Sequence, residues 1–233
     1  MNKSRKFAAL LIITVILIAF GAEVRAQDED DDGPHMYIER PRVFYGGALA
    51  GANFCQVDGD YFAGYHKVGL NVGGIVYAQL ARHAALSLEI LYSQKGSKSA
   101  RPKASLTLPD TYITKYGIAL NYAEVPVMIN YFDKRKSHFG VGVSYGRLVS
   151  SSENLQIDSL NIKRSIDFKN KYPFNPNALD LLAGFELHLW KGLFLNVRFQ
   201  YSLMPVRKDV PPDYARSTQS NNLWVMRLMY LVK

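Results

Sequence analysis

The residue types that most often carry enzyme or metal chemistry are present in this sequence, but their spacing does not suit such chemistry. The five histidines show no His-x-x-x-His spacing and no glutamate at the separation of a metal site. Ser144 lies in Val-Ser-Tyr-Gly, which differs from the Gly-x-Ser-x-Gly turn of serine hydrolases. The single cysteine, Cys55, can form neither an internal disulfide nor a cysteine-rich metal site. We therefore expect no catalytic residue, no metal and no cofactor, and predict that the protein is not an enzyme.

Seven charged residues form a second candidate constellation, because they occur in stretches where apolar and polar residues alternate. If the apolar face of these stretches meets lipid, the charged side chains point into the lumen of a barrel. An eight-stranded barrel has an interior just wide enough for side chains to fill, and unpaired buried charges there are strongly unfavourable. We expect four acids and three bases to neutralise one another in a structural network that closes the lumen. Its expected members are Lys67, Glu89, Glu124, Asp180, Glu186, Arg198 and Arg227.

Strands must position these charges, because the dominant period from Phe44 onward is two. Residues 66–80 alternate an apolar even face with a more polar odd face, and 179–189 and 193–203 repeat the pattern around the turn Lys191-Gly192. The eight expected strands are 44–54, 66–80, 84–96, 112–132, 137–150, 179–189, 193–203 and 222–232.

The stretch 112–132 departs from simple alternation. Its apolar residues have one parity up to Tyr122 and the other parity from Val125 onward. A β-bulge near Ala123 would reconcile the two halves. Pro126 lies in the same stretch and cannot donate a hydrogen bond to a ladder.

The connections between the expected strands alternate in length. The short ones are 81–83, 133–136 and 190–192, and the long polar ones are 55–65, 97–111, 151–176 and 205–221. Outer-membrane barrels have short periplasmic turns and long outer loops. The pattern predicts an all-β fold: a closed antiparallel transmembrane β-barrel of about eight strands. A soluble sandwich or lipocalin-like barrel would use the same alternation with its apolar face inward.

Aromatic residues near the ends of the expected strands are typical of girdles at the membrane interfaces. The candidates for these girdles are Tyr45, Tyr77, Tyr92, Tyr131, Trp190, Trp224 and Tyr230.

The basic balance of the chain does not indicate nucleic-acid binding. The formal charge is +8, and four bases and one acid in residues 1–26 supply +3 of it, so +5 remains on 27–233. The remaining Lys and Arg fall mostly in turns and loops instead of clustering with aromatic residues on one face. We expect no nucleic-acid partner.

The N-terminus predicts export. Residues 1–26 combine a basic start, an apolar run over 7–20 and the ending Val-Arg-Ala, which together are typical of a secretory signal peptide. Residues 27–43 begin with the acidic run Asp28–Asp32, which we interpret as a mobile periplasmic segment. The barrel is then expected over 44–233. Export without a mature membrane-spanning helix predicts that the protein lies in the cell outer membrane.

Several stretches resemble the PorT-like outer-membrane β-barrel proteins of the Bacteroidetes. They are Gln-Val-Asp-Gly-Asp at 56–60, Gly-Tyr-His-Lys-Val-Gly-Leu at 64–70, Leu-Glu-Ile-Leu-Tyr-Ser-Gln-Lys-Gly-Ser at 88–97, Leu-Asn-Tyr-Ala-Glu-Val-Pro at 120–126 and Gly-Val-Gly-Val-Ser-Tyr-Gly at 140–146. The resemblance implies an outer-membrane location. The family's namesake takes part in type IX secretion, so a link to protein secretion is implied by the resemblance alone.

Two functional classes remain open. The first is a structural or interaction protein of the cell envelope, which contacts outer-membrane lipid and binds other envelope or secretion-machinery proteins through loops 151–176 and 205–221. The second is a narrow porin-like transporter or ligand-binding barrel. A transporter should have small residues in the lumen, whereas the expected lumen contains Glu186, Phe194, Arg198 and Arg227. The sequence therefore favours the interaction protein.

Overall fold

The structure, a computed structural model, describes residues 43–60, 62, 64–104, 111–133, 137–159, 162–166, 172–208 and 215–232. The expected signal peptide, 1–26, and the acidic segment expected over 27–43, apart from Val43, lie outside the described residues. Within the described ranges, no helix has the length and apolar character needed to span a bilayer.

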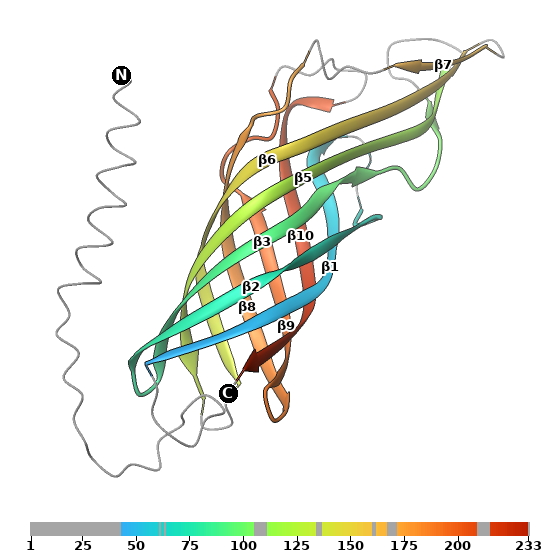
Figure 1. Cartoon of the computed structure of the whole chain (residues 1–233). Coiled ribbons are helices and arrows are strands. Elements are labelled where there is room, and N and C mark those ends of the chain that lie inside the picture. Colours follow the sequence, from blue (N-terminus) through green and yellow to red (C-terminus); the bar gives the residue numbers. More distant parts are fainter. Residues whose placement is uncertain are drawn as a thin grey trace, which may run out of the picture. The chain divides into compact units, whose positions relative to one another are not determined.

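The described chain forms one antiparallel sheet whose long strands close into a ring (Figure 1). The order around the ring is β1-β2-β3-β5-β6-β8-β9-β10, and β10 pairs with β1 to complete it. The short strands β4 and β7 pair with β5 and β6, respectively. The strands are β1 (Phe44–Asp60), β2 (Lys67–Ala81), β3 (Ala84–Lys98), β4 (Lys103–Ala104), β5 (Thr111–Phe132), β6 (His138–Ser159), β7 (Ile162–Ile166), β8 (Asn177–Trp190), β9 (Leu193–Ser202) and β10 (Ala215–Val232). The expected barrel of about eight strands is confirmed.

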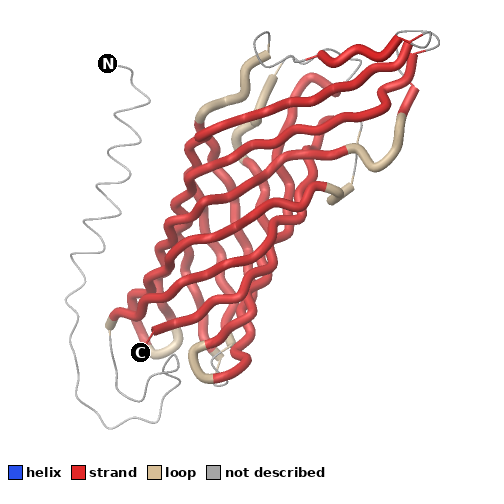
Figure 2. The backbone as a smooth tube through the Cα atoms, turned by 45° about the vertical axis from the view of Figure 1, so that its right-hand side comes forward, coloured by secondary structure: helices blue, strands red, loops and turns tan. Residues whose placement is uncertain are grey.

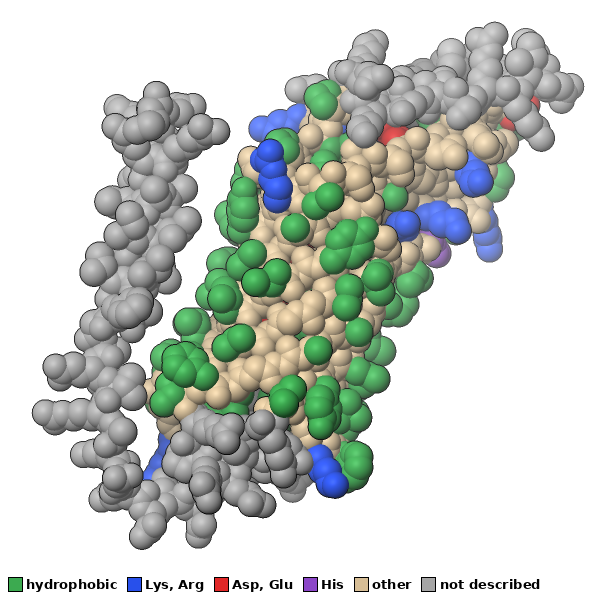
Figure 3. All heavy atoms as spheres, in the orientation of Figure 1, with side chains coloured by type: hydrophobic (Ala, Val, Ile, Leu, Met, Phe, Trp, Pro, Cys, Tyr) green, Lys and Arg blue, Asp and Glu red, His purple; other side chains and the backbone are tan. Residues whose placement is uncertain are grey.

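The period-two pattern divides each ring strand between two surroundings. In β2 the side chains of Val68 and Leu70 are exposed, whereas Asn71 and Ile75 are buried inside. Figure 3 shows hydrophobic side chains over the middle of the visible wall, with Lys and Arg at its two ends. An apolar exterior around a polar interior is the arrangement of a membrane barrel and excludes the soluble alternatives.

The connections differ at the two ends of the barrel, as the sequence predicted. Only Arg82 and His83 separate β2 from β3, and only Lys191 and Gly192 separate β8 from β9. Lys191 adopts a φ of 45°, in the left-handed region that tight turns use. These turns mark the periplasmic end. The C-terminus lies at this end as well (Figure 1).

At the outer end β1, β6 and β10 run further than predicted, whereas β5 was predicted at almost its full length. β5 and β6 each have 22 residues, whereas a bilayer needs only about 9–11 per tilted strand. The expected loop 151–176 contains the end of β6 and all of β7, and the expected loop 205–221 contains the start of β10. Figure 2 shows these strands continuing past the wall formed by their neighbours. In β6 and β10 alternation had identified only the parts with a lipid-facing apolar stripe, because polar residues cover the exterior of their outer parts.

The expected bulge near Ala123 in β5 is absent, and the change of parity has another cause. In β5, even-numbered residues from Tyr116 to Phe132 point inward without interruption. The bulge lies on the neighbouring strand: Asn121 pairs with Ser150 and Tyr122 with Leu148, so Val149 is the extra residue. Along β5, apolar side chains therefore face the lumen up to Tyr122 and face the lipid from Val125 onward. The backbone alternates without a break between the two parts.

Two of the expected interfacial aromatics were assigned to the wrong face. Tyr45 and Tyr77 are buried inside the barrel. Both share the inward parity of their strands, so proximity to a strand end was not enough to place them. The other candidates are exposed, namely Tyr92, Tyr131, Trp190, Trp224 and Tyr230.

Candidate functional site

The lumen is filled by side chains in layers, with an apolar cluster near each end. The periplasmic cluster includes Tyr77, Phe132 and Phe194, and the outer cluster includes Phe62 and Tyr116, whose rings stack with centroids 4.4 Å apart. Charged and amide side chains occupy the space between the two clusters. Apolar layers at both ends oppose the entry of water and ions to these charges.

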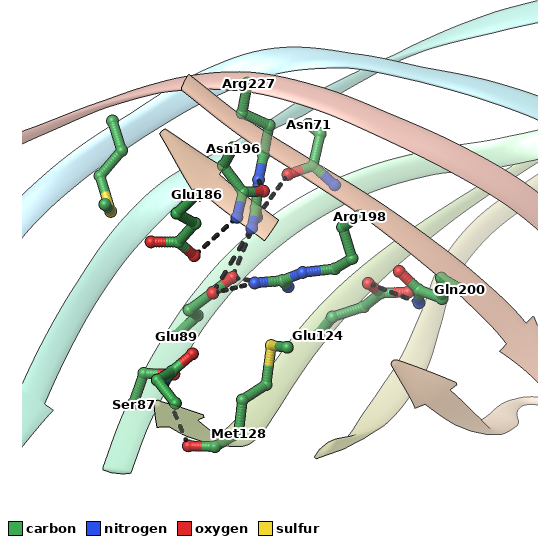
Figure 4. A network of polar contacts seen from close by, with 12 residues as sticks. Asn71, Ser87, Glu89, Glu124, Met128, Glu186, Asn196, Arg198, Gln200 and Arg227 are labelled. Carbon is green, nitrogen blue, oxygen red and sulfur yellow. Dashed lines mark hydrogen bonds and ion pairs between the residues drawn. The ribbon is translucent and has the colours of Figure 1, made fainter. Parts of the chain in front are cut away.

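Glu89 of β3 is the centre of an inner charge cluster, which we define as Glu89, Glu186, Arg198 and Arg227 (Figure 4). Arg198 of β9 binds both carboxylate oxygens of Glu89, with Nη1 at 3.1 Å from Oε2. Arg227 of β10 also binds both oxygens, with Nη1 at 2.9 Å from Oε2 and Nη2 at 3.4 Å from Oε1. One carboxylate therefore holds two guanidinium groups, and all three side chains are about 1% exposed.

Amide side chains connect the remaining groups of this cluster. Arg227 Nε donates to Asn196 Oδ1 at 2.9 Å, and Arg227 Nη1 donates to Asn71 Oδ1 at 3.2 Å. Asn196 Nδ2 in turn donates to Glu186 Oε1 at 2.6 Å. Asn196 and Asn71 thus supply acceptors to Arg227, and Asn196 supplies a donor to Glu186. These hydrogen bonds lower the free-energy penalty of burying the two charged groups.

The second carboxylate oxygen of Glu186 faces the periplasmic cluster. Tyr77 donates its hydroxyl to Glu186 Oε2 at 2.7 Å, and His138 Nε2 lies 2.6 Å from the same oxygen. The ring of His138 also packs against Phe132, with centroids 4.3 Å apart. This group forms the boundary between the charged layer and the apolar layer below it.

Nearer the outer end is an outer charge cluster, defined as Lys95, Glu124 and Asp180. Lys95 of β3 forms ion pairs with Glu124 of β5 and with Asp180 of β8, the latter at 2.5 Å. Gln200 and Ser202 of β9 both donate to Asp180 at 2.7 Å. The ammonium group of Lys95 also lies 5.1 Å from the ring centroid of Tyr122. Lys95 therefore joins an acid of the neighbouring strand β5 to an acid of β8, which lies further around the ring.

A third ion pair lies beyond the membrane, where the β9–β10 connection turns inward. Arg207 binds both oxygens of Glu153, at 2.8 and 2.9 Å, and we call this the mouth ion pair. The guanidinium carbon of Arg207 lies 4.5 Å from the ring centroid of Phe174, and its Nε donates to Gln219. The pair therefore fixes the connection against β6 and β10.

Burial alters two titratable groups beside this mouth. Burial raises the pKa of the Asp60 carboxyl, whose Oδ1 accepts the backbone N–H of Phe62 at 2.8 Å. Burial likewise raises the pKa of the Tyr116 phenol. Both shifts favour the uncharged form, as expected for groups inside an apolar layer.

The structure brings six of the seven expected lumen charges into the two charge clusters. Lys67 is the exception. It is half-buried at the outer end of β2, and no ion pair joins it to another described residue. Its position close to the mouth leaves its side chain partly in water, so it needs no buried acid.

Among the buried ionisable residues that sequence reasoning missed are Lys95, His138, Glu153 and Arg207. Lys95 shares the odd parity of Glu89 on β3, and His138 shares the even parity of Ser144 on β6, so alternation contained the signal for both. Glu153 and Arg207 lie in stretches that had been interpreted as loops, where no alternation rule applied.

The arrangement suits closure of the lumen better than catalysis. In the two charge clusters each carboxylate contacts a cation or a hydrogen-bond donor, so none stands ready as a general base. Within the described ranges no three His, Cys, Asp or Glu side chains are grouped so that they could hold a metal ion.

A match to a family model agrees with the architecture. A family model described as outer membrane protein beta-barrel domain matches residues 41–207. No curated protein matches the sequence. Among solved structures, Ail, the attachment invasion locus protein of Yersinia pestis, is 10% identical, with 82% of this chain and 100% of that chain covered and a TM-score of 0.43. Neisserial surface protein A is 10% identical, with 81% and 97% covered and a TM-score of 0.42. The outer membrane protein AlkL is 12% identical, with 89% and 97% covered and a TM-score of 0.34.

Proposed function

The chain belongs to the outer membrane protein β-barrel domain family, and from this premise we propose that it is a closed, non-enzymatic barrel with a structural or interaction role in the cell envelope. The protein lies in the outer membrane, where its wall contacts lipid. The role itself is carried by surfaces outside the lumen, because the lumen is filled.

The filled lumen is the observation that carries this proposal. Large side chains that belong to different strands meet at the centre, and Lys95, Arg198 and Arg227 are almost completely buried. Apolar clusters lie between these charges and each end of the barrel. A narrow porin-like transporter or ligand-binding barrel would need an open path or an empty cavity, and the packing of these layers argues against both.

The outer segments are the best candidates for protein partners. Loop regions 151–176 and 205–221 include the outer parts of β6, β7 and β10, which extend from a rigid barrel wall. Membership of the PorT-like family, and with it an origin in the Bacteroidetes and a link to type IX secretion, rests on the sequence resemblance. The domain division into an export signal (1–26), an acidic periplasmic segment (27–43) and a barrel (44–233) completes the proposal.

Two measurements test it. Purified protein in planar lipid bilayers should pass little current, and large, stable single-channel conductance would instead support the transporter. Affinity capture from intact envelopes should recover envelope proteins with the tagged chain. Replacing 162–166 by a Gly/Ser segment of equal length should reduce that recovery, whereas a change in the periplasmic turn 190–192 should not. Equal recovery with both variants would contradict the assignment of the partner surface to the outer segments.

A further inference from the structure

The two charge clusters of the lumen differ in their charge balance. In the inner charge cluster two glutamates face two arginines, so the formal charge is zero. The outer charge cluster contains two acids, Glu124 and Asp180, which we call the acid pair, but only one cation, Lys95. With both carboxyls ionised, this cluster would carry one uncompensated negative charge. The side chains of all three residues are at most 1% exposed, so water cannot stabilise that charge.

The other charged groups of the lumen do not supply the missing cation. Arg198 of β9 directs both of its Nη groups to Glu89, and Figure 4 shows its guanidinium group pointing toward that acid. His138 lies 2.6 Å from Glu186, so a positive charge on its ring would fall in the inner charge cluster, which is already neutral. Lys67 is only half-buried and forms no ion pair with another described residue.

The remaining elements around Glu124 contribute uncharged groups. Cys55 of β1 and Tyr122 of β5 lie close enough to interact with it electrostatically, and a thiol and a phenol are ordinarily uncharged at neutral pH. On β6 the residue paired with Glu124 is Gly146, and on β9 Gln200 provides an amide. The excess negative charge must therefore be removed within the acid pair itself, by the binding of a proton.

The hydrogen bonds indicate which acid holds this proton. Asp180 lies 2.5 Å from Lys95 Nζ and also accepts hydrogen bonds from Gln200 and Ser202, each at 2.7 Å. Glu124 contacts the same Nζ, but its only other described donor is Gln200, at 3.4 Å, and its buried Oε1 accepts no further hydrogen bond. Because donors stabilise the ionised form of a carboxyl group, Asp180 is the better anion and Glu124 the better neutral acid.

We propose that Glu124 is a proton-binding site, whose neutral carboxyl lies beside the Lys95–Asp180 ion pair and makes the charge of the filled lumen zero. The single ammonium group then balances a single carboxylate. Loss of the proton would leave a net negative charge inside the barrel, so the packing that closes the lumen should weaken as the pH rises. This proposal depends on the burial of the outer charge cluster and not on the proposed interaction role.

Infrared spectroscopy of the barrel in lipid vesicles tests the proton directly, because a protonated carboxyl has a C=O stretching band that a carboxylate lacks. At about pH 8 an ordinary glutamate, with a pKa of about 4.3, is ionised. One such band should nevertheless remain, and it should shift when only the glutamates carry an isotope label in the side-chain carboxyl. Glu124→Gln should remove the band. Asp180→Asn should remove it as well, since Glu124 then becomes the carboxylate that pairs with Lys95.

The matched control is Glu153→Gln, which removes another buried glutamate carboxyl. That carboxyl binds Arg207 through both oxygens, so it is ionised and does not contribute to the band. The control should therefore leave the band unchanged.

Unfolding in vesicles gives a second readout. The folded protein keeps the proton, whereas the unfolded chain loses it above the ordinary glutamate pKa of about 4.3, so stability should fall as the pH rises. Between about pH 6 and pH 8 the equilibrium constant for unfolding should rise more steeply in the unmodified protein than in Glu124→Gln, by about tenfold per pH unit. Asp60 is present in both proteins, so its own pH dependence cancels in the comparison.

Four results would overturn the proposal. They are the absence of a glutamate band at about pH 8, a band that shifts with labelled aspartate instead, a band that survives Glu124→Gln, and equal pH slopes of the two proteins. If Glu124→Gln does not fold, the isotope shift in the unmodified protein and the loss of the band in Asp180→Asn still decide the question. A missing band together with a charged imidazolium at His138 would place the balancing proton in the inner charge cluster and would likewise overturn the assignment.

Discussion

Strand β5 passes through two surroundings, and the same set of alternate residues points inward in both. In the membrane-crossing part the inward residues include Glu124 and Asn130, while Ile129 is exposed on the outside. In the outer part the inward residues include Ile118 and Leu120, each at most 1% exposed. The backbone is continuous, and only the medium outside the wall differs.

In these two stretches of β5 the medium outside the wall decides which face is the more apolar. Against lipid, apolar side chains lie outside and the interior collects the polar residues, which must then satisfy one another. Against water, apolar side chains lie inside, as in a soluble protein. The charged middle layer of the lumen and the apolar core of its outer part therefore differ in character, and each should respond differently to the same kind of substitution.

The largest effect is expected in the membrane part. Glu89→Leu leaves Arg198 and Arg227 buried without their shared carboxylate, so the free energy of unfolding should fall by about 3–5 kcal/mol. Urea-induced unfolding in lipid vesicles measures it. Replacing all three by apolar residues, Glu89→Leu with Arg198→Met and Arg227→Met, should recover most of the loss. A single variant as stable as the unmodified protein would show that the two arginines do not need this acid.

A charge added to the outer surface of β6 should show most directly which part of the strand faces lipid and which faces water. Val143→Arg puts a guanidinium on the lipid-facing surface of β6 and should reduce the free energy of unfolding by roughly 2–4 kcal/mol near the midplane. Ser152→Arg, on the exposed face of the same strand beyond the bulge, should change it by about 0.5 kcal/mol or less. Equal losses at the two positions in the same vesicle assay would mean that lipid covers both parts.

The mouth ion pair should matter less than the inner charge cluster, because water is closer. Glu153→Gln leaves Arg207 without a carboxylate while the cation stays against Phe174, and we expect a loss of about 1.5–3 kcal/mol. Protease cleavage in the β9–β10 connection should become faster in the variant, since this ion pair fixes the connection to β6. Lys208→Gln, an exposed neighbour of Arg207, serves as control and should leave the cleavage rate unchanged.

The smallest effect concerns Asp60 and pH. Burial raises the pKa of Asp60 in the folded protein, so the folded state binds this proton more readily than the unfolded state. The contribution of Asp60 to stability should therefore decrease as pH rises from the ordinary aspartate pKa of about 3.9 through the raised value, and stay constant above it. Asp60→Asn should remove this dependence and give a small gain at neutral pH. Unfolding curves over this pH range check it, and an unchanged pH profile in the variant would assign the dependence to other groups.

The sequence predicted the membrane-crossing parts well, because alternation against lipid is visible in the residue types. Glu186, Arg198 and Arg227 were placed in the lumen by parity alone, and the structure places them there. The outer parts were harder, since Ile118 and Leu120 invert the relation between apolar residues and the outer face. The alternation of inward and outward residues does not show at which residue a strand leaves the lipid and enters water. The bulge at Val149 was equally hidden, because exposed polar residues follow it on β6.

The closure of the ring by β1 and β10 has a consequence for the order of assembly. Glu89 is on the third strand, whereas Arg198 and Arg227 are on the last two, so neutralisation of this acid must wait until the end of the chain has been delivered. A partly inserted sheet would present an unmatched carboxylate to the bilayer interior. Insertion and closure should therefore occur together, with the final hairpin completing the hydrogen-bonded wall and the charge balance in one step.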